Sequence, residues 1–232
     1  MFLLRMGIMF SLVKKALLIA RTRPTQFLAV ARQYSLFART RLFQRLVFNS
    51  ENGITLGPNV RVQRLSCLSA ERPHGSVSIG SDSIVYEHAR IQAYGKGRVS
   101  VGEHSIIGDA RIYSRANITL GRRVVTSWNV FIQDFDPHPI DPELRAAQML
   151  RMCQAFKPSY RKMSAPPGRD WDFPVDPITI GDDVWLGANV TVLKGARIGD
   201  GCVVATGSVV TAGEYPARSV LAGAPARVIK TI

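Results

Sequence analysis

The feature that most constrains the fold is an apolar residue at every sixth position near the C-terminus. These positions hold Ile180, Leu186, Val192, Ile198, Val204 and Val210. An α-helix repeats near 3.6 residues and a strand near two, so neither alone sustains a period of six. The period fits a coil of three short strands joined by sharp corners, with one side chain per strand turned inward. The sequence therefore predicts an all-β, parallel β-helix rather than a sandwich of alternating strands.

A second, smaller position repeats with the same period. A small or β-branched residue stands four places after each of the first five apolar ones, at Val184, Val190, Ala196, Cys202 and Ser208. The pattern also runs from Ile79 to Ile107 and, after a one-residue slip, from Ile112 to Ile132. Such coils stack at a strand spacing of about 4.8 Å, and each is stabilised mainly by its neighbours. We expect the β-helix over residues 51–223, followed by a C-terminal tail over residues 224–232.

The positive charge is concentrated at the N-terminus. The chain of 232 residues has a formal net charge of +13, and no Asp or Glu precedes Glu51. Arg5 and the pair Lys14–Lys15 interrupt the apolar start, leaving no uncharged run of the ~18–20 residues that a membrane span requires. Residues 1–50 are predicted to form one or two basic amphipathic helices. Their apolar side either lies in a membrane interface through residues 1–45 or packs on the protein or a sister subunit.

The three cysteines, Cys67, Cys153 and Cys202, follow neither metal nor disulfide spacing. They are therefore interpreted as reduced thiols of a cytoplasmic protein. If the basic segment contacts anionic lipid, the protein would be peripheral to the inner face of the membrane.

The repeat is interrupted after Ile132 and restarts at Ile178. The inserted loop, residues 134–177, is unusually long for a connection without a function, which indicates a binding loop or a lid. Within it, His138 lies between Pro137 and Pro139, and both prolines restrict the backbone around the imidazole.

Three segments resemble the hexapeptide-repeat acyltransferase superfamily. They are Ile180-Gly-Asp-Asp-Val-Trp-Leu-Gly-Ala-Asn-Val, the segment from Ser127 to Asp141 around His138, and Ala222-Gly-Ala-Pro-Ala-Arg-Val-Ile-Lys230. The segment around His138 is most similar to polysaccharide and O-antigen O-acetyltransferases and less closely to maltose and galactoside acetyltransferases. The resemblance covers roughly residues 52–230. It implies a left-handed β-helix, a homotrimer with active sites between subunits, and acetyl-CoA as the acyl donor.

The resemblance implies that His138 is the catalytic base. A neutral imidazole can accept the proton of a sugar hydroxyl as that oxygen attacks a thioester, without a nucleophilic Ser or Cys. Asp136 or Asp134 would orient the ring, and Asp136 fits the family pattern better. No metal is expected.

The acyl donor would bind along the C-terminal coils. Carried over by position, Ala188 and Thr206 would hydrogen-bond the pantetheine arm through their backbones, and Thr211 would lie near the nucleotide. The amide of Ala188 would also serve the oxyanion that develops on the thioester carbonyl. Arg227 and Lys230 would pair with the 3′-phosphate or the pyrophosphate.

These residues favour an O-acetyltransferase that modifies a sugar of a cell-surface polysaccharide, an O-antigen or a lipid-linked glycan. Three alternatives remain open. They are an N-acyltransferase on an amino sugar of a nucleotide sugar, a non-catalytic β-helix scaffold, and a metal-dependent hydratase of the γ-carbonic anhydrase type. The hydratase needs three converging His ligands, and the four histidines are scattered along the chain. Nucleic acid is not expected as a partner, because no recognised binding module is present.

Overall fold

The computed structural model describes residues 50–155 and 174–232, which belong to one unit, Phe48–Ile232. The predicted N-terminal amphipathic segment lies outside the described residues apart from Ser50, which begins a short 3-10 helix, η1 (Ser50–Asn52). In the described part of the chain, no helix is both long and apolar enough to cross a membrane.

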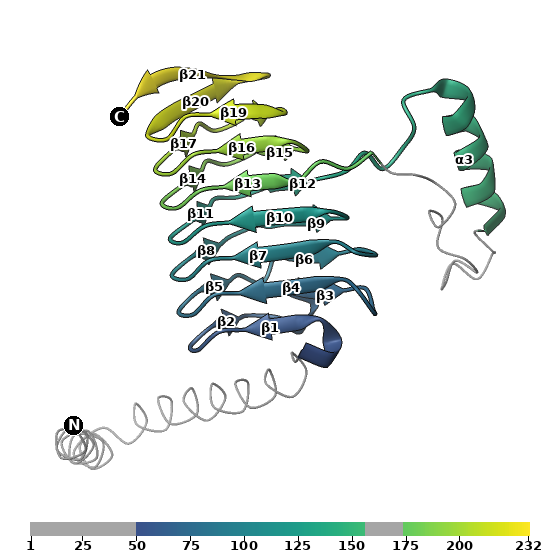
Figure 1. Ribbon diagram of the computed structural model, residues 1–232, viewed down its shortest axis with the longest axis horizontal. Helices are drawn as coiled ribbons and strands as arrows, with labels where there is room; N and C mark the ends of the chain where they lie inside the picture. Colours follow the sequence, from purple (N-terminus) through teal and green to yellow (C-terminus); the bar gives the residue numbers. More distant parts are fainter. Residues whose placement is uncertain (1–49, 156–173) are drawn as a thin grey trace, which may run out of the picture. The chain divides into compact units, whose positions relative to one another are not determined.

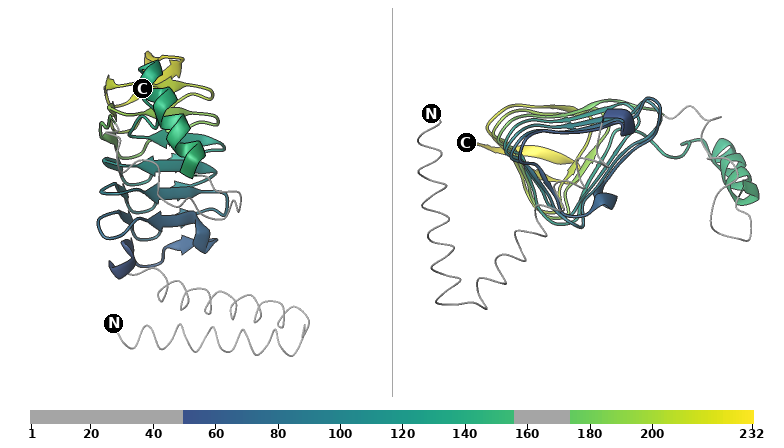
Figure 2. Two further views of the ribbon diagram at one scale, coloured as in Figure 1. Left: turned by 90° about the vertical axis from the view of Figure 1, so that its right-hand side faces the viewer. Right: turned by 90° about the horizontal axis from the view of Figure 1, so that it is seen from below.

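The fold is a left-handed parallel β-helix, as predicted, and its coils form a triangular prism (Figures 1 and 2). The chain passes through three sheets in each coil, here called A, B and C. A second 3-10 helix, η2 (Leu65–Cys67), precedes the first strand of sheet C. Among the described residues the strand ladders are parallel, except where β21 folds back antiparallel on β20.

The strands of each sheet are given in their order along the axis. Sheet A consists of β1 (Ile54–Leu56), β4 (Ser76–Ile79), β7 (Arg98–Val101), β10 (Asn117–Leu120), β13 (Ile178–Ile180), β16 (Ala196–Ile198) and β19 (Gly213–Tyr215). Sheet B consists of β2 (Arg61–Val62), β5 (Ile84–Val85), β8 (Ile106–Ile107), β11 (Val125–Thr126), β14 (Trp185–Leu186), β17 (Val203–Val204), β20 (Ser219–Gly223) and β21 (Ala226–Thr231). Sheet C consists of β3 (Leu68–Ala70), β6 (Arg90–Ala93), β9 (Ala110–Ser114), β12 (Val130–Gln133), β15 (Thr191–Leu193) and β18 (Val209–Val210).

The six-residue repeat lines the interior of the prism. All six apolar residues of the C-terminal repeat are buried, and so are the small residues that follow them. At two of the serine positions the hydroxyl serves the next coil: Ser83 Oγ accepts the amide of Ser105 at 3.0 Å, and Ser105 Oγ accepts the amide of Val124 at 3.1 Å. The small position therefore satisfies buried amides at a corner as well as saving space.

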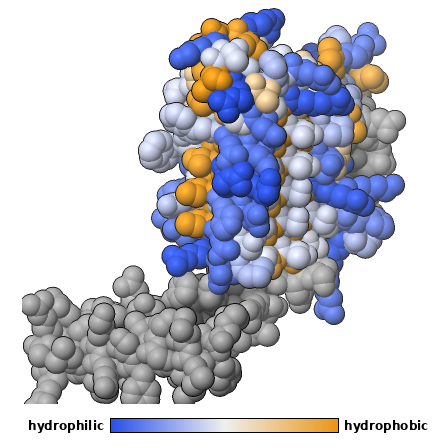
Figure 3. All heavy atoms as spheres, turned by 60° about the vertical axis from the view of Figure 1, so that its left-hand side comes forward, coloured by the Kyte–Doolittle hydropathy of each residue, from blue (hydrophilic) through white to orange (hydrophobic). Residues whose placement is uncertain are grey.

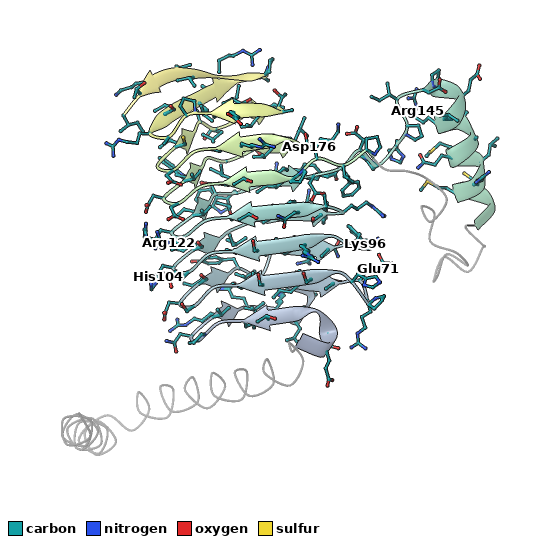
Figure 4. All side chains as sticks on the ribbon, in the orientation of Figure 1. Glu71, Lys96, His104, Arg122, Arg145 and Asp176 are labelled. Carbon is teal, nitrogen blue, oxygen red and sulfur yellow. The ribbon has the colours of Figure 1, made fainter. Side chains whose placement is uncertain are left out.

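Polar side chains join the two coils that flank the insertion, across sixty residues of sequence. At the corner between sheets A and B, Arg122 pairs with Asp182 at 2.6 Å, and Arg123 pairs with Asp183. At the corner between sheets B and C, Asn129 Nδ2 donates to Asn189 Oδ1 at 2.8 Å. Figure 4 shows Arg122 at the A–B corner, on the opposite side of the prism from the insertion. These contacts keep the two coils in register although the chain leaves the solenoid between them.

The insertion, predicted as a long loop, contains a helix that the sequence analysis did not predict. Residues Pro142–Ala155 form a helix, α3 (Figure 1). Asp141 caps it, because its Oδ1 accepts the amide of Leu144 at 2.9 Å, and Pro142 at the first position has no amide left to satisfy. A cap, a first-turn proline and a run of good helix formers therefore specify a helix here.

The two ends of the insertion meet in a short neck. Phe135 and Val175 form an antiparallel bridge, the amide of Asp136 donates to the Pro174 carbonyl at 3.0 Å, and that of Asp176 donates to the Asp134 carbonyl at 3.0 Å. A salt bridge of 3.2 Å from Lys194 Nζ to Asp136 Oδ2 ties the neck to the following coil. The neck thus fixes the point from which the insertion extends.

Asp134 is fully buried at the base of this neck. Its carboxylate accepts the Ser114 hydroxyl at 2.6 Å and the amides of Arg115 and Ala116 at 2.8 and 3.1 Å. Burial raises the pKa of the Asp134 carboxyl above its ordinary value, and these three hydrogen bonds act in the opposite direction. Asp134 therefore holds the preceding corner in place.

We predict that Asp134→Ala lowers the free energy of unfolding by about 3 kcal/mol, because three donors lose their acceptor inside the protein. Asp136→Ala is the matched control, since its ion pair is about one-third exposed and is worth about 1 kcal/mol or less. Urea denaturation followed by circular dichroism measures both. Equal losses for the two variants would contradict the structural role assigned to Asp134.

Candidate active site

The imidazole of His138 lies just beyond the neck and is exposed to solvent. Its Nδ1 is 2.9 Å from Oε1 of Gln148, which lies on α3. Asp141, three residues after His138, caps that helix, so the insertion carries both the imidazole and the side chain that contacts it.

Among residues 50–155 and 174–232, His138 has no hydrogen bond to the expected aspartates. Asp136 makes its salt bridge with Lys194, and Asp134 is saturated by Ser114 and two backbone amides. Both carboxylates are therefore used to hold the neck and the adjacent corner. The catalytic role of His138 remains a prediction from the sequence.

Ala188 and Thr206 occupy the corner between sheets B and C on successive coils. The amide of Gly207 donates to the Ala188 carbonyl at 2.9 Å. The amide nitrogens of Ala188 and Thr206 donate to no acceptor among residues 50–155 and 174–232. They are thus available to a ligand that lies along this corner.

The remaining predicted donor-binding residues fall into two places. Arg227 is exposed on β21, where it pairs in register with Ala222 beside the B–C corner. Lys230 is exposed farther along the same strand. Thr211, in contrast, follows β18 and lies at the other edge of sheet C, where its carbonyl accepts the Tyr215 hydroxyl at 3.1 Å. The structure therefore brings Ala188, Thr206 and Arg227 to one corner and does not place Thr211 there.

The insertion leaves the solenoid at the edge of sheet C that follows Gln133, whereas Ala188 and Thr206 precede that sheet. Figure 4 shows Asp176 at the edge where the insertion returns and Arg145 on α3. The predicted base and the predicted donor corner thus belong to opposite edges of one sheet. A surface hollow of about 640 Å³ lies over sheet A beside Thr179, Arg197 and Glu214, and none of the predicted site residues lines it.

Sequence reasoning missed two residues near these positions. Gln148 was overlooked because the insertion was taken as a loop, although helical spacing from Asp141 would have placed it one to two turns into a helix. Trp128 was also missed: its indole is 76% exposed, and the register puts it at the corner one coil before Ala188. No three His, Cys, Asp or Glu side chains of the described residues converge where they could hold a metal ion.

The known proteins to which this chain is similar in sequence are hexapeptide-repeat proteins and acetyltransferases. Residues 177–212 match the family model of the hexapeptide repeat of succinyl-transferase. The chain is 33% identical over 175 residues to WbbJ of Escherichia coli (strain K12), named as a lipopolysaccharide biosynthesis O-acetyl transferase, covering 74% of this chain and 79% of WbbJ. It is 32% identical over 134 residues to the galactoside O-acetyltransferase of the same strain, covering 57% of this chain and 64% of that protein.

Solved structures share the fold. The N-acyltransferase AntD from Bacillus cereus, in complex with dTDP and 3-hydroxybutyryl-CoA, superimposes with a TM-score of 0.57 at 18% identity, covering 83% of this chain and 87% of that one. The polySia-specific acetyltransferase NeuO gives a TM-score of 0.53 at 22% identity, covering 77% and 69%. The stacked coils, the repeat and the relationship to WbbJ together show that this chain belongs to the hexapeptide-repeat acyltransferases.

Proposed function

We propose that this acyltransferase moves an acetyl group from acetyl-CoA to a hydroxyl of a sugar, with His138 as the general base. The observation that carries the proposal is the exposed imidazole of His138, held at Nδ1 by Gln148 with its other nitrogen not engaged by any described residue. The sequence around His138 supports the O-acyl reaction, and so do the names of WbbJ and the galactoside enzyme.

The reaction needs one proton acceptor and no covalent enzyme intermediate. Nε2 of His138 takes the proton of the sugar hydroxyl while that oxygen attacks the carbonyl carbon of the thioester. The carbon–sulfur bond then breaks, the acetyl group stays on the sugar oxygen, and the imidazolium returns its proton to the departing thiolate. The sugar thereby exchanges its hydroxyl proton for the acetyl group, and CoA leaves as the thiol.

Acetyl-CoA is proposed to lie along the B–C corner. The available amides of Ala188 and Thr206 would bind the pantetheine carbonyls, and that of Ala188 would also face the oxyanion. Arg227 beside this corner and Lys230 farther along β21 are exposed cations that suit the phosphates. Thr211 lies away from this corner. Its proposed contact with the nucleotide therefore requires that the B–C corner holding the donor belong to a neighbouring subunit.

The acceptor is proposed to be a sugar of a cell-surface polysaccharide, an O-antigen or a lipid-linked glycan. The relationship to WbbJ supports this acceptor class. The basic residues before Glu51 support contact with an anionic membrane through residues 1–45. That contact would keep a cytoplasmic enzyme close to a lipid-linked acceptor.

A homotrimer is proposed because one chain holds its predicted base and its predicted donor corner at opposite edges of sheet C. A neighbouring copy could bring the insertion of one chain to the B–C corner of the next. The outer face of sheet B supports this assembly, since from β5 to β20 it carries one apolar side chain per coil where sheet A carries mostly hydroxyls (Figure 3). The apolar row consists of Ile84, Ile106, Val125, Trp185, Val203 and Val220.

The proposed base is tested by replacing His138. His138→Asn lowers kcat by on the order of 10²–10⁴-fold and leaves the affinity for acetyl-CoA unchanged, because proton transfer is lost without loss of donor contacts. The rate of thiol release from acetyl-CoA, in the presence of a panel of pyranosides and amino-sugar nucleotides, measures kcat. His104→Asn is the matched control, because His104 is also exposed and lies at a corner position with positive φ that Asn tolerates. Transfer to amines alone would replace the O-acyl proposal with the N-acyl alternative.

The proposed donor site is tested by replacing Arg227. Arg227→Ala weakens binding of acetyl-CoA by about 10-fold or more, as expected for loss of a charge-assisted contact to phosphate. Calorimetric titration of wild type and variant with CoA and with 3′-dephospho-CoA shows which phosphate is contacted. Arg197→Ala, which removes an exposed arginine from sheet A, serves as the control. Equal affinities for the wild type and Arg227→Ala would refute the assignment of Arg227.

The proposed trimer is tested by placing a charge in the apolar row of sheet B. Val125 is 38% exposed in the apolar row, and Val125→Glu should convert the trimer into monomers because it places a charge in a desolvated interface. Thr179→Glu adds the same charge to the exposed face of sheet A and should leave the trimer intact. Sedimentation velocity distinguishes the species. A monomeric wild type at micromolar concentration would overturn the proposed trimer.

A further inference from the structure

Gln148 is the buried residue of an otherwise exposed helix. Its side chain is 2% exposed, whereas the other residues of α3 whose exposure is described are exposed or half-buried. Burying a primary amide costs free energy unless its hydrogen bonds are replaced. Both the NH₂ group and the carbonyl oxygen of the Gln148 side chain therefore need hydrogen-bond partners inside the protein.

Both ends of the Gln148 amide have such partners. Nε2 lies 3.3 Å from the Pro137 carbonyl, and Oε1 lies 2.9 Å from Nδ1 of His138. A carbonyl oxygen can only accept a hydrogen bond, so the amide group facing Pro137 must be the NH₂. The orientation of the amide is thereby fixed, and its oxygen faces the imidazole.

This orientation determines which nitrogen of His138 carries the proton. An amide oxygen has no hydrogen to donate, so Nδ1 of the neutral ring must be the N–H that donates to it. Nε2 is then left with its lone pair directed away from Gln148. A neutral imidazole free in water prefers the other tautomer, with the hydrogen on Nε2, which could not accept a proton there.

The backbone around His138 is held by the same helix. Arg145 Nη1 donates to the carbonyls of Pro139 and Ile140 at 2.9 and 2.7 Å. Gln148 thus donates a hydrogen bond to the residue before His138, and Arg145 donates hydrogen bonds to the two residues after it. One helix therefore holds both the position of the turn and the proton arrangement of the ring.

We propose that Gln148 is a positioning residue that holds His138 in the Nδ1–H tautomer and so keeps Nε2 ready to accept the substrate proton. The proposal rests on His138 being the general base. It assigns to a neutral amide the role that the sequence suggested for Asp136 or Asp134. Because the amide carries no charge, it orients the ring without adding an ion pair to the imidazolium, which leaves that ion free to return its proton to the thiolate.

The test reads the tautomer directly. Long-range ¹⁵N–¹H spectra of the full chain, recorded at a pH where the imidazole is neutral, report which nitrogen of His138 bears the hydrogen, and His138→Asn assigns its signals among the four histidines. The wild type should be mainly Nδ1–H. Gln148→Leu, which keeps the size and removes the acceptor, should shift the ring toward Nε2–H and lower kcat about 10–100-fold, with KM for acetyl-CoA changed less than about twofold.

Two further variants separate positioning from folding. Gln148→Glu retains an oxygen facing Nδ1 and should preserve the Nδ1–H tautomer. Arg145→Met loosens the turn without touching the acceptor and should also preserve it. A wild type that is mainly Nε2–H, or an unchanged tautomer in Gln148→Leu, would overturn the proposal. Full transferase activity in His138→Asn would instead refute His138 as the base, a result that the wild-type spectrum cannot mimic.

Discussion

Backbone hydrogen bonding between successive coils is the interaction on which the rest of the molecule depends. Apart from β21, the described strands pair in parallel with their counterparts in the adjacent coils. A one-residue shift of a strand would therefore turn its inward side chains outward. The buried hexad residues and the corner hydroxyls of Ser83 and Ser105 make this register unique. The candidate site inherits its geometry from that register, because Ala188 and Thr206 share a corner only when their coils are aligned.

The solenoid tolerates a large interruption because its flanking coils recognise one another without it. The pairs Arg122–Asp182 and Arg123–Asp183 and the amide pair of Asn129 with Asn189 bridge those coils at two corners. The insertion is at the third corner, where Phe135 and Val175 bring its ends together. His138 is thereby placed outside the packed interior.

The sequence was sufficient for the coils because one inward side chain per six residues is a local pattern that the fold repeats. It was insufficient for the surroundings of His138, which depend on non-repeating contacts. Asp136 and Asp134 have the right spacing for a partner of the ring, yet Lys194 and the Ser114–Ala116 corner engage them. Gln148 lies ten residues from His138, and only the helix capped by Asp141 brings it back to the ring. The cap was visible in the sequence, whereas the competition for the aspartates was not.

The neck has a consequence for how such an enzyme can change. Because residues 134–136 and 174–176 close on each other through backbone hydrogen bonds, the described stretch of residues 137–155 adds no strand to the prism. If that stretch is exchanged as a cassette, it carries the proposed base together with its supporting helix, α3, and leaves the proposed donor corner unchanged. One scaffold could thus acquire new acceptors by recombination at a single junction rather than by gradual remodelling of a packed core.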